Sequence, residues 1–253
     1  MKKTIFAVLL IALLLGGGSA QVKPWSQWTK AEAEKILNQS AWGQTQTETD
    51  TSEMMYSPTS QSGISSSTRP GVSGTTTDRQ SISGSRASQG AKNQAISVNY
   101  HIRLLSAKPV RQAFMRVIEL AQKTPDKALL DDLQSFVQRD FSDFIVVAVN
   151  FDSTDGRFSG PALQAFASSN LGSLKNKTYL ERNDGKRVFL MQYHAPINDG
   201  LGAKFIFPRI VDEKNFINAE TGSFRFYSEV NSQLKLNVSF KTSELMYNGQ
   251  LEY

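Results

Sequence analysis

Residues 143–151 read Asp-Phe-Ile-Val-Val-Ala-Val-Asn-Phe, a short apolar run that is rich in β-branched side chains. Acidic residues precede the run, and a cluster of turn-forming residues from Asp152 to Gly156 follows it. Such a run predicts a strand that is buried on both faces at the middle of a sheet. We therefore expect this strand to organise the folded part of the chain.

Helical and strand-like segments flank this central run. Apolar and polar residues alternate from Ala95 to Ala107, which predicts a strand with one buried face. Apolar residues at helical spacing predict helices that begin near Pro109 and Pro125, and a third helix can open near Pro161. Further strand candidates follow, with Asp184-Gly185 favouring a tight hairpin: 173–182, 186–194, 203–211, 223–230, 234–242 and 244–253.

This order of elements predicts an α+β fold for a single domain spanning residues 96–253. We expect a mixed or mainly antiparallel sheet with about three helices packed on one face. We expect Arg111, in a first helical turn, to face solvent rather than to form an anion site. The basic residues of the hairpin 175–187 are interleaved with acidic ones, and we interpret them as a charged strand edge that discourages aggregation.

Residues 1–20 have the three parts of a secretory signal peptide. Lys2 and Lys3 form the positive end, Ile5 to Leu15 form a short apolar core, and small residues precede Gln21. We expect cleavage before Gln21 and export to the periplasm or the exterior of a bacterium; an uncleaved anchor is the alternative. No later segment approaches the ~20 apolar residues of a membrane helix, so we expect no transmembrane segment in the mature chain.

Residues 21–42 predict a helical head that contains all three tryptophans of the protein, Trp25, Trp28 and Trp42. Thr29 and Glu32 have the spacing of a capping box, which predicts the start of a helix. So short a helix needs a surface on which to dock. The tryptophans can anchor the head on its own domain, or they can form a binding site for another envelope protein.

Residues 43–95 are dominated by Ser, Thr, Gly and Gln, with few apolar residues. This composition is typical of a disordered linker. We therefore expect a disordered tether between the head and the domain.

Composition excludes several chemistries. The 253 residues include no cysteine, so disulfides, thiolate metal sites and cysteine nucleophiles are impossible. The formal charge of +5 is not concentrated on one element, so we expect no nucleic-acid partner. The two histidines, His101 and His194, lie on predicted strands without metal-like spacing, and we expect no metal and no cofactor.

Asp152 and Asp155 are the candidate ligand-binding residues of the domain. They follow the central strand, where α/β proteins often place a ligand site. A plain strand-to-helix turn explains the same residues, because Asp, Ser and Gly are ordinary turn formers. A hydrolase with a site near Asp152 and Asp155 is therefore an alternative function, without a named catalytic residue.

Three stretches of the chain resemble a known group of sequences. They are Trp25-Ser-Gln-Trp28-Thr-Lys-Ala-Glu-Ala-Glu-Lys-Ile-Leu-Asn-Gln-Ser40-Ala-Trp42, Leu105-Ser-Ala-Lys-Pro109-Val-Arg111-Gln-Ala113, and Met246-Tyr-Asn-Gly-Gln-Leu-Glu-Tyr253. They resemble an uncharacterised family of exported bacterial proteins with a Trp-rich N-terminal motif. The resemblance implies export and a shared domain, and it implies no activity.

The layout of the chain favours a non-enzymatic exported protein that binds a ligand or acts as a scaffold in the envelope. A Trp-rich head on a long tether would suit recognition of an envelope protein. The sequence leaves the oligomeric state open.

Overall fold

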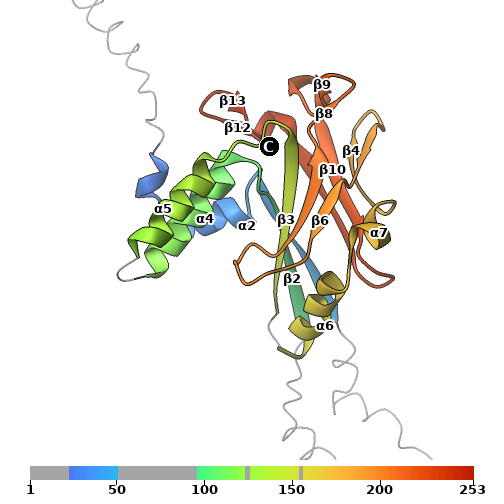
Figure 1. Ribbon diagram of the computed structural model, residues 1–253, viewed down its shortest axis with the longest axis horizontal. Helices are drawn as coiled ribbons and strands as arrows, with labels where there is room; N and C mark the ends of the chain where they lie inside the picture. The colour runs from blue at the N-terminus through green and yellow to red at the C-terminus, as the bar shows by residue number, and fades with distance from the viewer. Residues whose placement is uncertain (1–22, 51–95, 123–125, 154–155) are drawn as a thin grey trace, which may run out of the picture.

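The computed structural model describes residues 23–50, 96–122, 126–153 and 156–253. These residues form two antiparallel sheets packed face to face, with helices against the outer side of one of them (Figure 1). The predicted α+β class is confirmed. The number of helices is not: the described residues contain five α-helices rather than about three.

The larger sheet, sheet A, has five strands in the order β1-β2-β3-β7-β6. The predicted central strand is confirmed as β3, whose residues from Ile145 to Val149 are all buried. All neighbouring strands in sheet A pair in the antiparallel direction. The strands are β1 (Gly43–Asp50), β2 (Ile96–Leu104), β3 (Phe144–Ser153), β7 (Ala203–Pro208) and β6 (Gln192–His194).

The smaller sheet, sheet B, has four strands in the order β11-β10-β4-β5. Gly185, with a φ of 81°, lies between β4 and β5, so the hairpin predicted at Asp184-Gly185 is confirmed. The strands are β4 (Thr178–Arg182), β5 (Arg187–Phe189), β10 (Ser223–Glu229) and β11 (Lys235–Lys241). Two short ribbons complete the strands: β8 (Ile210–Val211) with β9 (Lys214–Asn215), and β12 (Met246–Tyr247) with β13 (Gln250–Leu251).

Three helices cover the outer side of sheet A: α2 (Lys30–Asn38), α4 (Lys108–Ala121) and α5 (Lys127–Gln138) (Figure 1). Helix α6 (Gly156–Ala167) lies at one end of the two sheets, and α7 (Leu171–Leu174) follows it. The buried ring of Phe166 in α6 stacks on Phe151, on the inner side of sheet A. Helix α6 therefore closes the end of the space between the sheets, in addition to the helices on the outer side of sheet A.

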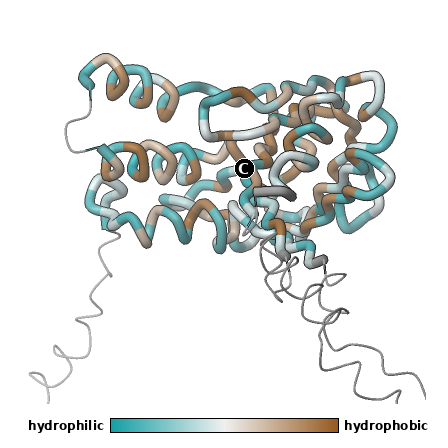
Figure 2. Tube along the Cα trace, turned by 90° about the horizontal axis from the view of Figure 1, so that it is seen from below, coloured by the Kyte–Doolittle hydropathy of each residue, from teal (hydrophilic) through white to brown (hydrophobic). Residues whose placement is uncertain are grey.

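The core lies between the sheets and is rich in phenylalanine. Alternation along β7 directs Phe205 and Phe207 inward, where both pack against the ring of Phe226 in β10. Phe224 and Phe240 stack beside them with ring centroids 5.2 Å apart. Figure 2 shows hydrophobic and hydrophilic segments alternating along the chain in both the helical and the sheet parts.

The N-terminal residues belong to this fold and are not a separate head. Trp28, Ala33 and Leu37 are buried in the same core as the strands of both sheets. The boundary predicted between a head at 21–42 and a domain at 96–253 is therefore wrong. Helix α2 needed a surface on which to dock, and α4 together with sheet A provides it.

The predicted linker 43–95 begins too early. Residues 43–50 form β1, which pairs with β2 along its whole length, from Gly43 opposite Arg103 to Asp50 opposite Ile96. The strand was missed because it carries no apolar residue. Its inward side chains instead bond to the free edge of β11: Gln44 Nε2 donates to Ser239 O, Gln46 Nε2 donates to Lys235 O, and Gln46 Oε1 accepts from Asn237 N.

The rest of the predicted linker, residues 51–95, lies outside the described residues, as does the predicted signal peptide. Residues 51–95 connect two positions that face each other in neighbouring strands, so they do not join separate bodies. Among the described residues, no helix is both long enough and apolar enough to cross a bilayer.

Candidate functional site: a polar hollow beside helix α2

Helix α2 forms one wall of the candidate site, and local bonds fix where it begins. The predicted capping box is present, because Thr29 Oγ1 accepts from Glu32 N and Glu32 Oε2 accepts from Thr29 N. Lys23 Nζ lies 2.7 Å from the same carboxylate. The hydrogen bonds from Lys23 and Thr29 lower the pKa of Glu32 to about 2. The start of α2 is thus held by charge and capping together.

The carboxyl end of α2 lies directly against β1. A Cβ atom on Gly43 would lie 2.1 Å from the main-chain oxygen of Leu37, so only glycine permits this approach. The side chain of Arg103 is buried beneath the same end, where its Nε donates to Leu37 O and its Nη2 donates to Asn38 Oδ1. Burial lowers the pKa of Arg103 to about 10, and the cation lies where the helix dipole is negative.

Beyond the end of α2, polar side chains form a hydrogen-bonded network across β1, β2 and β3. Thr45 Oγ1 lies 2.9 Å from His101 Nδ1, and His101 Nε2 lies 2.6 Å from Asp152 Oδ2. Asn99 Nδ2 donates to Asp152 Oδ1, and Thr47 Oγ1 donates to Asn99 Oδ1. The strand register explains the network, since Thr45 faces His101, Thr47 faces Asn99, and Asn99 faces Asp152.

Asp152 is the anionic member of the network. Its partial burial acts to raise its pKa, but the hydrogen bonds from His101 and Asn99 outweigh that effect and hold the pKa below its ordinary value. The side chain of Asp152 is 61% exposed, whereas that of His101 is only 13% exposed. The carboxylate therefore stays charged at neutral pH with one side open to solvent.

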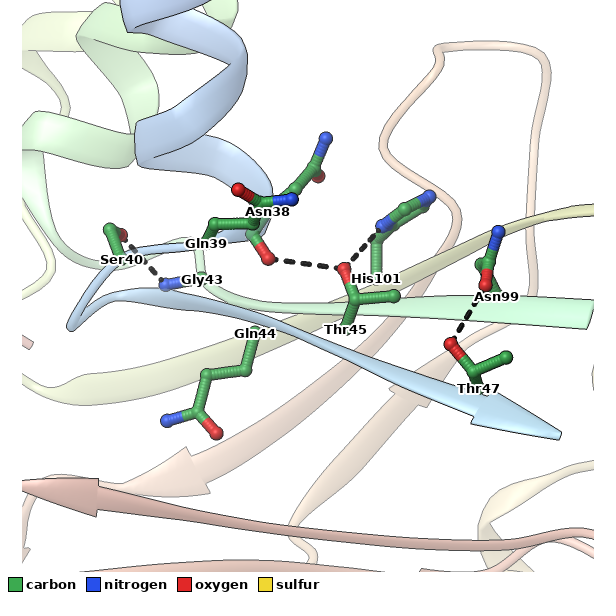
Figure 3. Close-up of a pocket in the computed structure, with 9 residues that line it drawn as sticks. All are labelled: Asn38, Gln39, Ser40, Gly43, Gln44, Thr45, Thr47, Asn99 and His101. Atoms are coloured by element: carbon green, nitrogen blue, oxygen red, sulfur yellow. Dashed lines mark hydrogen bonds between the residues drawn. The ribbon is translucent and has the colours of Figure 1, made fainter.

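A hollow of about 570 Å³ lies between the end of α2 and this face of the sheet (Figure 3). Its lining contains glycine and hydrogen-bonding residues, with no aliphatic side chain, no aromatic ring other than the imidazole of His101, and no carboxylate. The side chain of Gln44 points away from the others, toward β11 (Figure 3). The nine lining residues are Asn38, Gln39, Ser40, Gly43, Gln44, Thr45, Thr47, Asn99 and His101.

The tryptophans proposed as binding residues contribute to packing. Trp28 is buried in the core, and Trp25 is partly buried against it. Trp42 Nε1 donates to Glu252 O over 2.8 Å, and the Trp42 ring meets Tyr247 edge to face. Of the two interpretations of the head, the structure favours anchoring on its own domain, and none of these residues lines the hollow.

The two proposed aspartates have different outcomes. Asp152 is the penultimate residue of β3 and not part of a turn, and Asp155 lies outside the described residues. His101 and His194 share no site, because β3 and β7 separate their strands. In the described part of the chain, no group of three or more His, Asp or Glu residues is placed to hold a metal ion.

The residues that sequence reasoning missed are Thr45, Thr47 and Asn99, together with the pairing of His101 with Asp152. The alternation of Thr with Gln and Glu from Thr45 to Thr49 is the signal that could have identified β1. No family model, curated protein or solved structure matches the chain.

Proposed function

We propose that this chain is a non-enzymatic exported binding protein that holds an uncharged, polar ligand in the hollow beside α2. The observation that carries the proposal is the lining of the hollow, which offers amide, hydroxyl and imidazole groups and no carboxylate. Its size lies within the range of roughly 300–1,000 Å³ that is usual for small-molecule sites.

The lining also indicates the kind of ligand. Side-chain amides and hydroxyls both donate and accept hydrogen bonds, so they suit the hydroxyl and amide groups of a saccharide or a peptide. Thr45, Thr47, Asn99 and His101 are already fixed by bonds to neighbouring residues, which lowers the entropy lost on binding. Because no aliphatic side chain lines the hollow, we expect moderate affinity.

Export is part of the proposal and is supported by the pattern of residues 1–20. N-terminal sequencing of the protein from an envelope fraction should find a mature chain that begins at Gln21. A chain that retains residues 1–20 would contradict cleavage. An envelope partner is also proposed, and it would have to use a surface other than the buried side of Trp28.

Calorimetric titration of the mature chain tests the proposed ligand class. The probes are tri-N-acetylchitotriose and trialanine amide, which are rich in hydroxyl and amide groups. Replacing Thr47 by Val should weaken binding by about two- to tenfold, the usual value of one hydrogen bond. Thr49→Val is the matched control, because Thr49 lies on the same face of β1 but outside the hollow.

Two outcomes would contradict this proposal. One is that neither probe binds, and the other is that Thr47→Val and Thr49→Val weaken binding equally. A Gln39→Ala variant provides an independent test from the α2 side of the hollow, since Gln39 lines it without taking part in the network.

A hydrolase is the second candidate, because Thr45, His101 and Asp152 form a hydroxyl–imidazole–carboxylate series. The geometry makes it the weaker candidate. Thr45 Oγ1 donates its single proton to Asn38 O over 3.1 Å, and the Asp152 side chain, which should be shielded, is 61% exposed. Hydrolysis of p-nitrophenyl acetate separates the two functions. If the protein only binds its ligand, Thr45→Val and the wild type should hydrolyse the ester at equal rates. If the protein is a hydrolase, Thr45→Val should lose most of the hydrolysis rate.

A further inference from the structure

The outer side of sheet B, which faces away from the core, carries two ordered rows of side chains. Residues directly opposite one another in β5, β4 and β10 form each row. One row is aromatic and consists of Phe189, Tyr179 and Tyr227; the other is ionic and consists of Arg187, Glu181 and Arg225. We call these six residues the outer-face rows.

The aromatic row is continuous. Tyr179 and Tyr227 stack with ring centroids 5.1 Å apart, and Phe189 meets Tyr179 with a centroid distance of 5.8 Å. Cross-strand aromatic pairs stabilise a sheet, which explains why Tyr179 and Tyr227 are half-buried. Phe189 is different, because 46% of this large apolar residue is exposed. Phe189 therefore presents an exposed apolar ring at the end of the aromatic row.

The ionic row lies beside the aromatic one and contacts it. Glu181 accepts hydrogen bonds from both Arg187 and Arg225, and these bonds hold the pKa of Glu181 below its ordinary value. The guanidinium of Arg187 lies 4.4 Å from the centre of the Tyr179 ring, and that of Arg225 lies 5.9 Å from the Tyr227 ring. The two arginines are thus fixed in place with part of each side chain exposed.

Each carboxylate on this face is shared between two cations. Glu181 is shared by Arg187 and Arg225, and Glu229 is shared by Lys177 and Lys235. The face therefore keeps a positive excess that its own acids do not neutralise, so electrostatics favour an anionic partner.

We propose that the outer-face rows bind an anionic polysaccharide whose sugar rings lie along the aromatic row and whose carboxylates pair with the arginines. Guanidinium groups bind carboxylates through two parallel hydrogen bonds, and aromatic faces provide the apolar contact for a sugar ring. The central carboxylate of Glu181 accepts hydrogen bonds from sugar hydroxyls, but it repels a continuous chain of phosphates. That carboxylate favours a glycan over a nucleic acid.

Titration of the mature chain with hexagalacturonate in about 0.15 M salt tests this proposal, since exposed charges are largely screened there beyond ~8 Å. Cellohexaose is the neutral glycan for comparison, and poly-glutamate and single-stranded DNA are the competing polyanions. We expect hexagalacturonate to bind at least about tenfold more tightly than any of these, because only it combines rings with carboxylates.

Two variants that each remove one positive charge distinguish a specific binding site from general electrostatic attraction. Arg225→Gln removes a member of the ionic row, and Lys241→Gln removes a cation from the same face of sheet B but outside the rows. We expect Arg225→Gln to weaken hexagalacturonate binding by about tenfold, as for one charge-assisted pair, and Lys241→Gln by less than about twofold. Phe189→Thr should also weaken binding, and its exposure makes loss of folding a poor explanation.

Three results would overturn the proposal: equal effects of Arg225→Gln and Lys241→Gln, tighter binding of DNA or poly-glutamate, or no binding of hexagalacturonate. Thr47→Val, which alters the hollow on the other sheet, should bind hexagalacturonate as the wild type does. This outcome keeps the outer-face rows separate from the proposed hollow, so that either proposal can fail alone.

Discussion

The two faces of sheet A are built by different physical rules, although the same strands supply both. On the inner face, Ile102 and Leu104 of β2 are buried against apolar neighbours. On the outer face, the alternate residues His101 and Arg103 are held by hydrogen bonds. Because a slip of one residue would exchange the two faces, apolar packing on the inner face fixes the register that assembles the polar network on the other.

The outer face itself divides into two regions. Helix α2 covers Arg103, whose cation binds the end of the helix, whereas His101, two residues earlier, lies at the open hollow. The same strand thus presents one polar residue as a structural anchor and the next one as part of a site. The difference teaches that the position of α2, rather than the composition of β2, determines which polar residues a ligand can reach.

The largest expected effect is on the inner face. Phe205→Ala removes a fully buried ring that packs on Phe226 and should lower the free energy of unfolding by about 3–5 kcal/mol. Its neighbour Ile206 lies on the opposite face and is only partly buried, so Ile206→Ala should cost clearly less. Urea denaturation measures both variants, and equal losses would mean that the two faces do not differ in packing.

Arg103→Met tests the covered region of the outer face. Methionine keeps apolar bulk but leaves Leu37 O and the side chain of Asn38 without a donor, and we expect a loss of about 2–4 kcal/mol. The stability of Arg103→Lys should lie between that of Arg103→Met and that of the wild type, because an ammonium group lacks the planar fork of donors. Tryptophan fluorescence during urea denaturation reports unfolding around α2, because all three tryptophans lie between Trp25 and Trp42. A loss below about 1 kcal/mol would show that α2 is held mainly by its apolar residues.

Sequence periodicity predicted the parts of the fold that apolar packing determines. The buried run of β3, the helix that begins near Pro109 and the Gly185 hairpin all leave local signals. Strand β1 leaves none of this kind, because its inner side chains Gln44 and Gln46 bond to backbone groups of a strand almost 200 residues away. The need of an edge strand for such partners is not visible in local composition.

Arg111 shows the same limit for a single residue. It was expected to face solvent, but it is buried, and its guanidinium donates to the main-chain oxygens of Leu105, Ser106, Val137 and Arg139. Burial lowers its pKa to about 10. A sequence does not indicate which carbonyl groups will converge on a cation, since these belong to the ends of different elements.

The candidate site was predicted only in part, for a related reason. The sequence singles out Asp152, but beside a predicted turn, and it places His101 on a predicted strand without a partner. Their pairing depends on the register between β2 and β3, which places Asn99 opposite Asp152. Thr45 and Thr47 lie within the predicted linker 43–95, so the sequence analysis does not include this wall of the hollow.

Shortening the connection between β1 and β2 tests the register in which these two strands pair in sheet A. Residues 51–95 can be replaced by Asn-Gly, which favours a two-residue hairpin between antiparallel strands, because Asp50 lies directly opposite Ile96. A shorter connection costs less closure entropy, so we expect stability to be unchanged or up to about 2 kcal/mol higher. Urea denaturation measures the change. A substantial loss of stability would contradict this register.

The smallest expected effect lies in the open region, at Asp152. The pKa of Asp152 is lower in the folded protein than its ordinary value of 3.8. The charged carboxylate therefore stabilises the fold at pH values above 3.8, and this stabilisation is lost as the pH falls through the lower pKa of the folded state. Because the side chain is 61% exposed, we expect Asp152→Asn to lower the free energy of unfolding by no more than about 1 kcal/mol near pH 6.

Urea denaturation of this variant and the wild type, at several values from about pH 6 down to about pH 2, should show the difference narrowing as the pH falls. Asp132→Asn, at an exposed position on α5, is the carboxylate-to-amide control and should show no comparable trend. A constant difference would mean that the network depends on hydrogen bonds that an amide cannot make, and not on charge. The open region would then resemble the inner face, where shape rather than ionisation determines stability.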